Sequence, residues 1–488
     1  MSPFIFRRRA ASAALLVGAA LLAAPAFAGD KSATPEGAQA VQGFFDRFLP
    51  APPAGSPSLV TVKPEGQAYV VSTDLAALNG LFQAAGADAT YDPAPFVLRL
   101  FEQDDGKWRV VQDSFPRIVS HIKDMTASSE IINYRQTIVI DPAIAWFVSG
   151  AATADKGSIA MTSANAEQAF DFGPVKADYA TAVNANDTVS STIKEEIADI
   201  AFKVSATDKD GKSVSSSGRM DTAAFNIGVD GLKSKKLFDL LSLLSVHRAD
   251  LADHEGEFKD LLRPLAAPGL RFVEGGEASK LLIASPIGAI ALSDAKLAIG
   301  ASNAGPDSVI DATIGAEGLS LPAGLFPPGA TDLTPSKVDL AFTVKGIDIA
   351  AAANQAIDAL HLGGSGPAIS EADSAKVSAA LIGPGPLKVV LAPSHVVAPA
   401  IDADLAGELR YATGKTSGAV TVKMRGFDKT MTAVNGLGPN IAMKSLPMLA
   451  MAKGLAKTER DGALSWLVEV GDDRSIKVNG IPLGKAQQ

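Results

Sequence analysis

Long stretches of this chain alternate apolar and polar residues with a period of two. Between positions 174 and 229, Val175, Ala177 and Tyr179 share one face of an extended segment, and segment 336–345 repeats the pattern most cleanly. Alternation of this kind is typical of strands in antiparallel sheets that bury one face and expose the other. The chain is therefore constrained first of all to build antiparallel β-structure.

Segments with helical periodicity interrupt these strands. The strongest is segment 233–262, in which apolar residues recur every seven positions. Its main row consists of Leu237, Leu244, Leu251 and Phe258. The segment predicts either one long helix or a two-helix hairpin broken near Ala249, and Gly256 weakens its middle. Together, strands and helices predict a multi-domain, β-rich α+β fold in which antiparallel curved sheets carry packed amphipathic helices.

Three strand ends share one local pattern: a charged residue, glycine, a large apolar residue and a second charged residue, followed by a helix. The copies are Asp230–Lys233, Lys345–Asp348 and Arg425–Asp428. Glycine permits a sharp turn, and we expect the aspartate to cap the helix in the second and third copies. In the first copy Ser234 is the better cap candidate. The spacings of 115 and 80 residues exclude a solenoid of fixed period, and leave both duplication and chance recurrence open.

The closing stretch 466–483 contains the sequence Val-Asn-Gly-Ile-Pro-Leu at positions 478–483. With the three junctions, this stretch resembles the AsmA-like and YdgA-type envelope proteins of Gram-negative bacteria. Those proteins join an N-terminal export signal or anchor to a long β-rich periplasmic body. The resemblance implies an envelope-maintenance or lipid-handling role, and it supplies no catalytic residues to carry over.

The N-terminus has the three parts of a secretory signal peptide. Three arginines at positions 7–9 precede the apolar run 10–24, Pro25 ends that run, and Ala-Phe-Ala at 26–28 fits a cleavage site. The run is shorter than the roughly 20 residues that a spanning helix needs. We therefore expect cleavage and export to the periplasm rather than a retained anchor, and no transmembrane span thereafter.

The length of 488 residues exceeds what one hydrophobic core usually serves. After the signal peptide (1–28), we predict an N-terminal α+β domain (29–128) and a β-rich domain (129–345). The long helix or helix hairpin at 233–263 is inserted in the second of these. A C-terminal α+β domain (346–488) completes the chain.

Composition narrows the function classes. The chain has no cysteine, which excludes disulfides, thiolate metal sites and a cysteine nucleophile. Its net charge of −9, which becomes −12 once the three arginines of the signal peptide are removed, argues against a general nucleic-acid binder. We expect no cofactor.

Few ionisable residues are spaced for chemistry. His247 and His254 flank Asp250, but on a continuous helix the two histidines lie about 10 Å apart along the axis. We therefore interpret them as partly buried helix residues with Asp250 as their partner, and expect no metal site. Asp402 and Asp404 share one face of a strand, which we interpret as an exposed face rather than a catalytic pair. No catalytic residue is predicted.

Five of the nine methionines fall between Met424 and Met451. Methionine adapts to varied apolar partners, including acyl chains, and also fills ordinary cores. The predicted ligand-binding residues are therefore Leu237, Leu244, Leu251, Phe258, Met443, Met448 and Met451. We expect a non-enzymatic exported protein that binds a lipid-like amphiphile or an envelope protein in an apolar groove. The alternative is a periplasmic hydrolase of envelope polymers, for which no recognisable motif is present.

Overall fold

The computed structural model describes residues 29–49, 58–84, 86–207, 211–247, 250–322, 327, 329–363, 367–383, 385–412 and 414–485. The predicted signal peptide lies outside the described residues. The chain divides into two compact units. Unit 1 takes in the chain up to Ser215, then Ala224–Leu265 and His361–Gly363, and unit 2 takes in the remainder. The predicted three-domain division stays a prediction.

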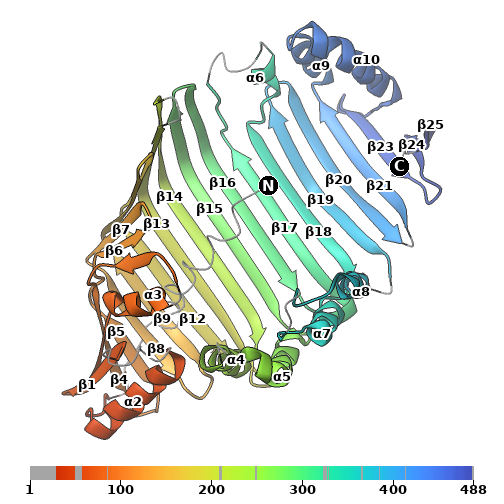
Figure 1. The fold of residues 1–488 in the computed structure, drawn as a ribbon. Helices are drawn as coiled ribbons and strands as arrows, with labels where there is room; N and C mark the ends of the chain where they lie inside the picture. Colours follow the sequence, from red (N-terminus) through yellow and green to blue (C-terminus); the bar gives the residue numbers. More distant parts are fainter. Residues whose placement is uncertain are drawn as a thin grey trace. The chain divides into compact units, whose positions relative to one another are not determined.

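Unit 1 is built on a branched antiparallel sheet (Figure 1). Its strands are β1 (Val60–Glu65), β2 (Ala68–Asp74), β3 (Ala89–Tyr91), β4 (Pro95–Glu102), β5 (Trp108–Gln112), β6 (Ile118–Ile122), β7 (Met125–Ile132), β8 (Arg135–Asp141), β9 (Trp146–Ala154), β10 (Lys156–Ser163), β11 (Ala166–Phe172), β12 (Val175–Val183) and β13 (Val189–Thr207). The long strand β13 pairs first with β12 and further along with β11. One branch then runs β12–β9–β8–β5–β4–β2–β1, and the other runs β11–β10–β7–β6–β3.

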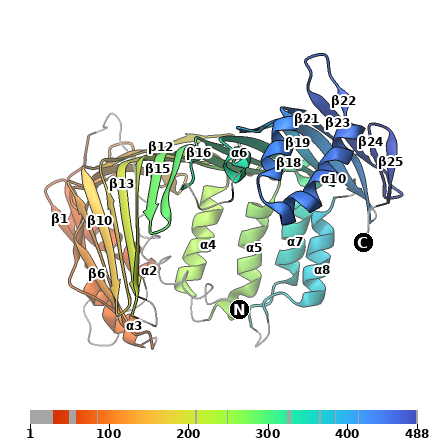
Figure 2. The same cartoon turned by 90° about the horizontal axis from the view of Figure 1, so that it is seen from above.

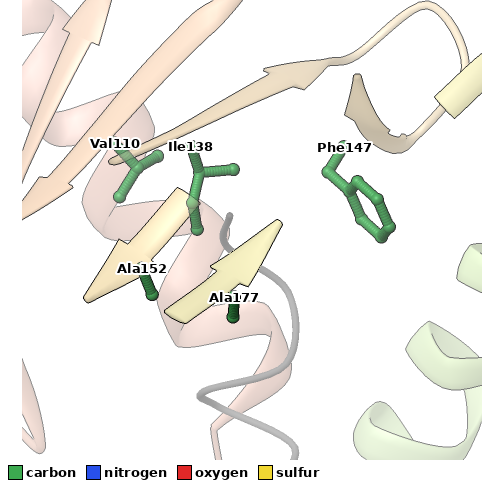
Figure 3. Close-up of a cluster of buried hydrophobic side chains, with 5 residues drawn as sticks. All are labelled: Val110, Ile138, Phe147, Ala152 and Ala177. Carbon is green, nitrogen blue, oxygen red and sulfur yellow. The ribbon is translucent and has the colours of Figure 1, made fainter. Parts of the chain in front are cut away.

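Helices accompany this sheet, and the first of them, α2, packs on its apolar residues. These helices are α2 (Pro35–Phe48), η1 (Leu75–Leu78), α3 (Asn79–Ala84), α4 (Ser234–Val246), η2 (Leu251–His254) and α5 (Glu255–Ala266), the last of which ends at the unit boundary. The side chains of Ala38 and Val41 on α2 pack against Tyr69 and Val71 of β2. The second core cluster of the unit contains Val110, Ile138, Phe147, Ala152 and Ala177 (Figure 3). Its members come from neighbouring strands because residues opposite each other in a ladder share a face.

Unit 2 is a nearly sequential antiparallel meander. Its strands are β15 (Arg271–Ser285), β16 (Gly288–Ser302), β17 (Ser308–Glu317), β18 (Lys337–Ile347), β19 (Leu387–Ala398), β20 (Ile401–Ala412), β21 (Lys415–Arg425), β22 (Lys457–Thr458), β23 (Leu464–Val470), β24 (Ser475–Val478) and β25 (Ile481–Lys485). Each pairs with the next from β15 to β21, and β21 then pairs with β23. Strand β14 (Ser213–Leu232) belongs to both units. The predicted β-rich α+β class with antiparallel sheets and several helices is confirmed.

Pairs of helices are inserted between paired strands of this meander. Helices α7 (Ile349–Ala359) and α8 (Glu371–Leu381) connect β18 to β19, and α9 (Phe427–Asn435) and α10 (Pro439–Leu455) connect β21 to β23. The short helices η3 (Gly305–Asp307) and α6 (Ala330–Leu333) complete the unit. In Figure 2, α7, α8 and α10 stand on the same side of the sheet.

The three repeated junctions have the same backbone geometry. Gly231, Gly346 and Gly426 adopt φ values of 73°, 76° and 73°, a left-handed conformation that favours glycine. The apolar residues that follow them are all buried: Leu232, Ile347 and Phe427. Each junction therefore turns the chain out of a strand and anchors the first turn of a helix in the core.

The caps differ from the sequence expectation in two of the three copies. Asp348 accepts a hydrogen bond from the amide of Ala351 and caps α7 as expected. Ser234 is not a cap, because it is the first residue of α4 and its buried hydroxyl donates to the carbonyl of Ile144. Asp428 is not a cap either, since Gly426 holds the cap position of α9 and the Asp428 side chain pairs with Lys453.

Segment 233–262 forms two helices rather than one. Helix α4 ends at Val246, and the helical path resumes with η2 and α5. On α4, Leu240 and Leu243 are buried, and the ring of Phe238 contacts those of Phe44 and Phe48 on α2. Helix α4, which precedes the break in the segment, therefore packs against α2.

Replacing Gly346 by alanine should destabilise unit 2. The left-handed backbone costs an alanine about 1–2 kcal/mol, and the added Cβ would lie 2.3 Å from the carbonyl oxygen of Pro386. We expect Gly346→Ala to lower the free energy of unfolding by at least that amount, which would be measured as a lower urea midpoint. Gly385→Ala is the matched control, because its Cβ would meet nothing within 4 Å. Equal midpoints for the two variants would contradict the role given to the junction.

Candidate functional site

The strands of unit 2 place apolar side chains on one face of the sheet. On β18, Val338, Leu340, Phe342 and Val344 alternate with polar neighbours. The strand register places the apolar residues of neighbouring strands opposite one another. Leu340 lies opposite Ile314 of β17, which lies opposite Leu297 of β16. Because opposed residues share a face, the sheet acquires a continuous apolar side.

Helices cover one end of this apolar side. The side chains of Val422, Met424 and Trp466 on β21 and β23 pack with Phe427 of α9 and Leu449 of α10. The indole N–H of Trp466 donates to the carbonyl of Ala452 on α10 at 2.7 Å, which fixes this helix on the sheet. The α7–α8 pair leaves from the opposite ends of the strands, after β18 (Figure 1).

The middle of the apolar side remains exposed. We call it the open apolar face, and its most exposed members are Phe272, Leu297, Ile299, Ile310, Ile314, Val389 and Tyr411. Leu297 and Ile314, which lie directly opposite each other, are 50% and 43% exposed. Glu274 of β15, opposite Ile299, is the charged residue that bounds this surface. Soluble proteins seldom expose contiguous apolar surface without a binding role.

The predicted ligand-binding residues fall into two separate groups. Leu237, Leu244, Leu251 and Phe258 belong to unit 1, where all four are half-buried. Met443, Met448 and Met451 belong to unit 2 and are exposed on α10. Met424 of β21 and Met431 of α9, in contrast, are partly buried and pack against the core cluster of Phe427, Trp466 and Val478. The open apolar face lies outside the predicted set, although the alternation of β18 is visible in the sequence.

The opposite face of the same sheet carries an ion-paired cluster around Asp402 and Asp404. The Nδ1 atom of His395 lies 2.7 Å from a carboxylate oxygen of Asp404. The guanidinium of Arg425 donates to both aspartates, at 3.3 and 3.2 Å. Asp461 pairs in turn with Arg425 and Lys423. The two aspartates are therefore partners of cations on neighbouring strands.

This environment decides the chemistry available to Asp404. The hydrogen bond from His395, supported by Arg425, holds the pKa of the Asp404 carboxyl below its usual value. A glycosidase-type general acid needs the reverse, a carboxyl whose pKa is raised so that it keeps its proton. Asp404 is thus suited to ion pairing and unsuited to that acid role.

The Asp404→Asn variant should lose stability in a pH-dependent way. Because the folded-state pKa is lowered, ionised Asp404 contributes stability above the usual aspartate pKa of about 3.9. This contribution is lost as the pH falls through the folded-state value. Asp404 is 44% exposed, so we expect a loss below about 1 kcal/mol at pH 7 that shrinks under acid, measured by urea unfolding. The control is Glu469→Gln, opposite Ala419 on the same face. A loss as large in the control would contradict a specific role for the pair.

Glu195 is a half-buried carboxyl in unit 1 that sequence reasoning missed. It lies opposite Ala177 of β12, a member of the core cluster that Tyr134 and Tyr179 flank. Burial raises the pKa of Glu195. Burial also raises the pKa of Tyr134 to about 12 and that of Tyr179 further. Glu195 lies two residues from both Ile193 and Ile197 on β13. This spacing places its carboxyl on the apolar face of the strand, and the sequence alone could have indicated its burial.

The Glu195→Gln variant should be more stable than the parent at neutral pH. A raised folded-state pKa means that the charged form of the carboxyl is disfavoured by folding, so stability falls as the pH rises through that value. The amide removes this penalty, and the gain should vanish below the usual glutamate pKa of about 4.3. Thermal unfolding at acid and neutral pH measures it. Glu196→Gln, on the exposed face of the same strand, is the control, and an equal gain there would refute the assignment.

His247, Asp250 and His254 lie closer together than the sequence predicts. The expected 10 Å separation assumed a continuous helix and is wrong, because α4 ends before His247 and η2 begins after Asp250. The two imidazole rings lie with their centroids 3.4 Å apart. Asp250 is the partner of both histidines, as expected.

No protein-family model, curated protein or solved structure matches the chain. The resemblance to AsmA-like and YdgA-type proteins therefore stays a prediction. Among the described residues, no helix combines the length and the apolar character needed to cross a membrane.

Proposed function

We propose that the protein is an exported binding protein that holds the apolar chain of a lipid-like amphiphile against the open apolar face of unit 2. The observation that carries this proposal is the exposure of seven large apolar side chains on one side of a well-ordered antiparallel sheet. Antiparallel sheets normally bury the apolar side and leave the polar side to water. An apolar ligand would supply the missing cover.

The dimensions of the face favour an elongated occupant. It extends across the strands from β15 to β20, each of which pairs with the next. At about 4.8 Å between strands, this width is about 24 Å, which suits an extended long-chain acyl group. Because apolar side chains line this site on one side only, the site favours a flexible chain that lies along the sheet over a compact, rigid ligand.

The two faces of the sheet differ in a way that would orient such a ligand. The opposite face carries paired charges, including His395 with Asp404 and Lys296 with Asp339. Because these charges remain solvated, that face has no tendency to bind an apolar chain. Binding is therefore expected on one side only.

Exposed methionines on α10 favour a second candidate, the docking of an envelope protein. Met443, Met448 and Met451 are exposed, and methionine-rich surfaces adapt to varied protein partners. This candidate uses the outer surface of a helix that is already fixed on the sheet by Trp466. It would leave lipid binding on the open apolar face unaffected.

Paired substitutions on the open apolar face test the lipid proposal. We expect the purified mature protein to bind cis-parinaric acid, a fluorescent long-chain fatty acid, and to carry lipid detectable by native mass spectrometry. The Leu297→Asp/Ile314→Asp double variant should weaken binding about tenfold or more, since burial of an exposed Leu or Ile side chain contributes about 1 kcal/mol or more.

Thr313→Asp is the matched control. Thr313 is adjacent to Ile314 and points to the opposite face, so the same charge placed there should leave binding unchanged. Circular dichroism would establish that both variants are folded. Binding that is equally strong in the double variant and the parent would refute the open apolar face as the ligand site.

A further inference from the structure

We propose that His247, Asp250 and His254 form a binding site for a divalent transition-metal ion, of which Zn²⁺ fits the donors best. The site belongs to unit 1 and is independent of the proposed lipid binding. It sits where the chain passes from α4 to η2 and α5.

The donor atoms converge within the dimensions of one ion. One nitrogen of each histidine and one carboxylate oxygen of Asp250 all lie within 4.8 Å of one another. The Nδ1 atom of His247 is 3.3 Å from Asp250, and the Nε2 atom of His254 is 3.7 Å from it. For Zn²⁺ bonds of about 2.0–2.2 Å, tetrahedral geometry places neighbouring donors about 3.3–3.6 Å apart. The His247–Asp250 separation agrees with an edge of such a tetrahedron, and the His254–Asp250 separation, which is measured to the other carboxylate oxygen, is slightly longer.

Of these two contacts, the one between His247 Nδ1 and Asp250 is a hydrogen bond, and at 3.5 Å to Oδ2 it is a long one. Protein N–H···O bonds are usually about 2.7–3.2 Å long, and the histidine–aspartate distances at this site are longer. The His395–Asp404 pair of the same chain, at 2.7 Å, shows what a direct hydrogen bond between these residue types looks like. A shared ion would explain why the donors approach one another without reaching that distance.

The two imidazole rings would have to separate to share an ion. Their centroids are 3.4 Å apart and their planes are tilted by 36°. Two cationic rings at this distance would repel each other. Metal coordination uses neutral imidazoles through their lone pairs. Because two rings bound to one tetrahedral ion have centroids about 5 Å apart, the rings would rotate apart about their side-chain bonds when the ion binds.

A second carboxylate lies where metal sites commonly have one. The Nδ1 atom of His254, on the side of the ring away from Asp250, is 3.7 Å from Glu257. Carboxylates that face the distal nitrogen of a ligating histidine orient the ring and raise its basicity. Both histidine side chains are 29% exposed and that of Asp250 is 51% exposed. An ion can thus reach the site from solvent and keep water as a fourth ligand.

The donor set selects the class of metal. Two imidazoles with one carboxylate suit Zn²⁺, whereas Mg²⁺ and Ca²⁺ prefer oxygen donors throughout. A bound ion would tie the end of α4 to the start of η2 and α5. Metal binding would therefore stabilise the relative position of these helices.

Titration of the metal-free mature protein with Zn²⁺, followed by isothermal calorimetry, tests the site. We expect one ion per chain at this site, and a rise in the melting temperature of the parent. His254→Gln should weaken binding about a hundredfold or more, because loss of an outer partner alone costs roughly 10–100-fold. Glu257→Gln should show that smaller effect. His121→Gln is the matched control, since His121 pairs with a single aspartate, Asp92, at 3.2 Å.

Cobalt substitution adds a readout of geometry. Co²⁺ in the parent should give the intense visible absorption of a tetrahedral ion, and His247→Gln and His254→Gln should abolish it while circular dichroism remains that of the folded protein. Affinity for Zn²⁺ that is unchanged in both histidine variants would overturn the proposal. So would weakening of equal size in His121→Gln, or an octahedral Co²⁺ spectrum in the parent.

Discussion

The opposition of residues across antiparallel ladders is the constraint on which the rest of the structure depends. In unit 2, the alternation seen on β18 continues from strand to strand between β15 and β23, through register shifts in the ladders β17–β18, β18–β19 and β19–β20. A shift of one residue in any ladder would exchange the two faces. The apolar side and the ion-paired side are therefore consequences of one pattern.

Covering the apolar side requires elements that leave the sheet and return to it. The left-handed glycine at each junction achieves this, since it turns the chain directly from a strand into a helix whose first apolar residue is buried. Two such helix pairs in unit 2 leave from opposite ends of the strands, after β18 and after β21. Cover is consequently firm at the α9–α10 end, where Phe427 and Trp466 meet, whereas the side chains of the open apolar face, between strands β15 and β20, stay exposed among the described residues.

Much of this architecture could be predicted from sequence, and the failures have local causes. Period two and the glycine junctions identify the strands and their exits, because both are properties of the backbone near the residue itself. The actual contacts of Ser234 and Asp428, which are not caps, could not be predicted, since their partners Ile144 and Lys453 are distant in sequence. Likewise, the contact between His247 and His254 depends on the end of α4 at Val246, and the sequence has neither glycine nor proline at 247–250 to mark it.

The site residues show the same division between pattern and environment. The methionines of α10 were selected by residue type, yet type alone does not separate the exposed Met448 from the core residue Met431. The open apolar face follows from strand alternation, but its exposure depends on where the helices end, which no single strand specifies. Position on a face is thus encoded locally, whereas cover is decided by the tertiary structure. The open apolar face is apolar because its strands alternate, and it is exposed because the helices pack elsewhere on the sheet. It is therefore the surface on which a ligand of this protein is best sought.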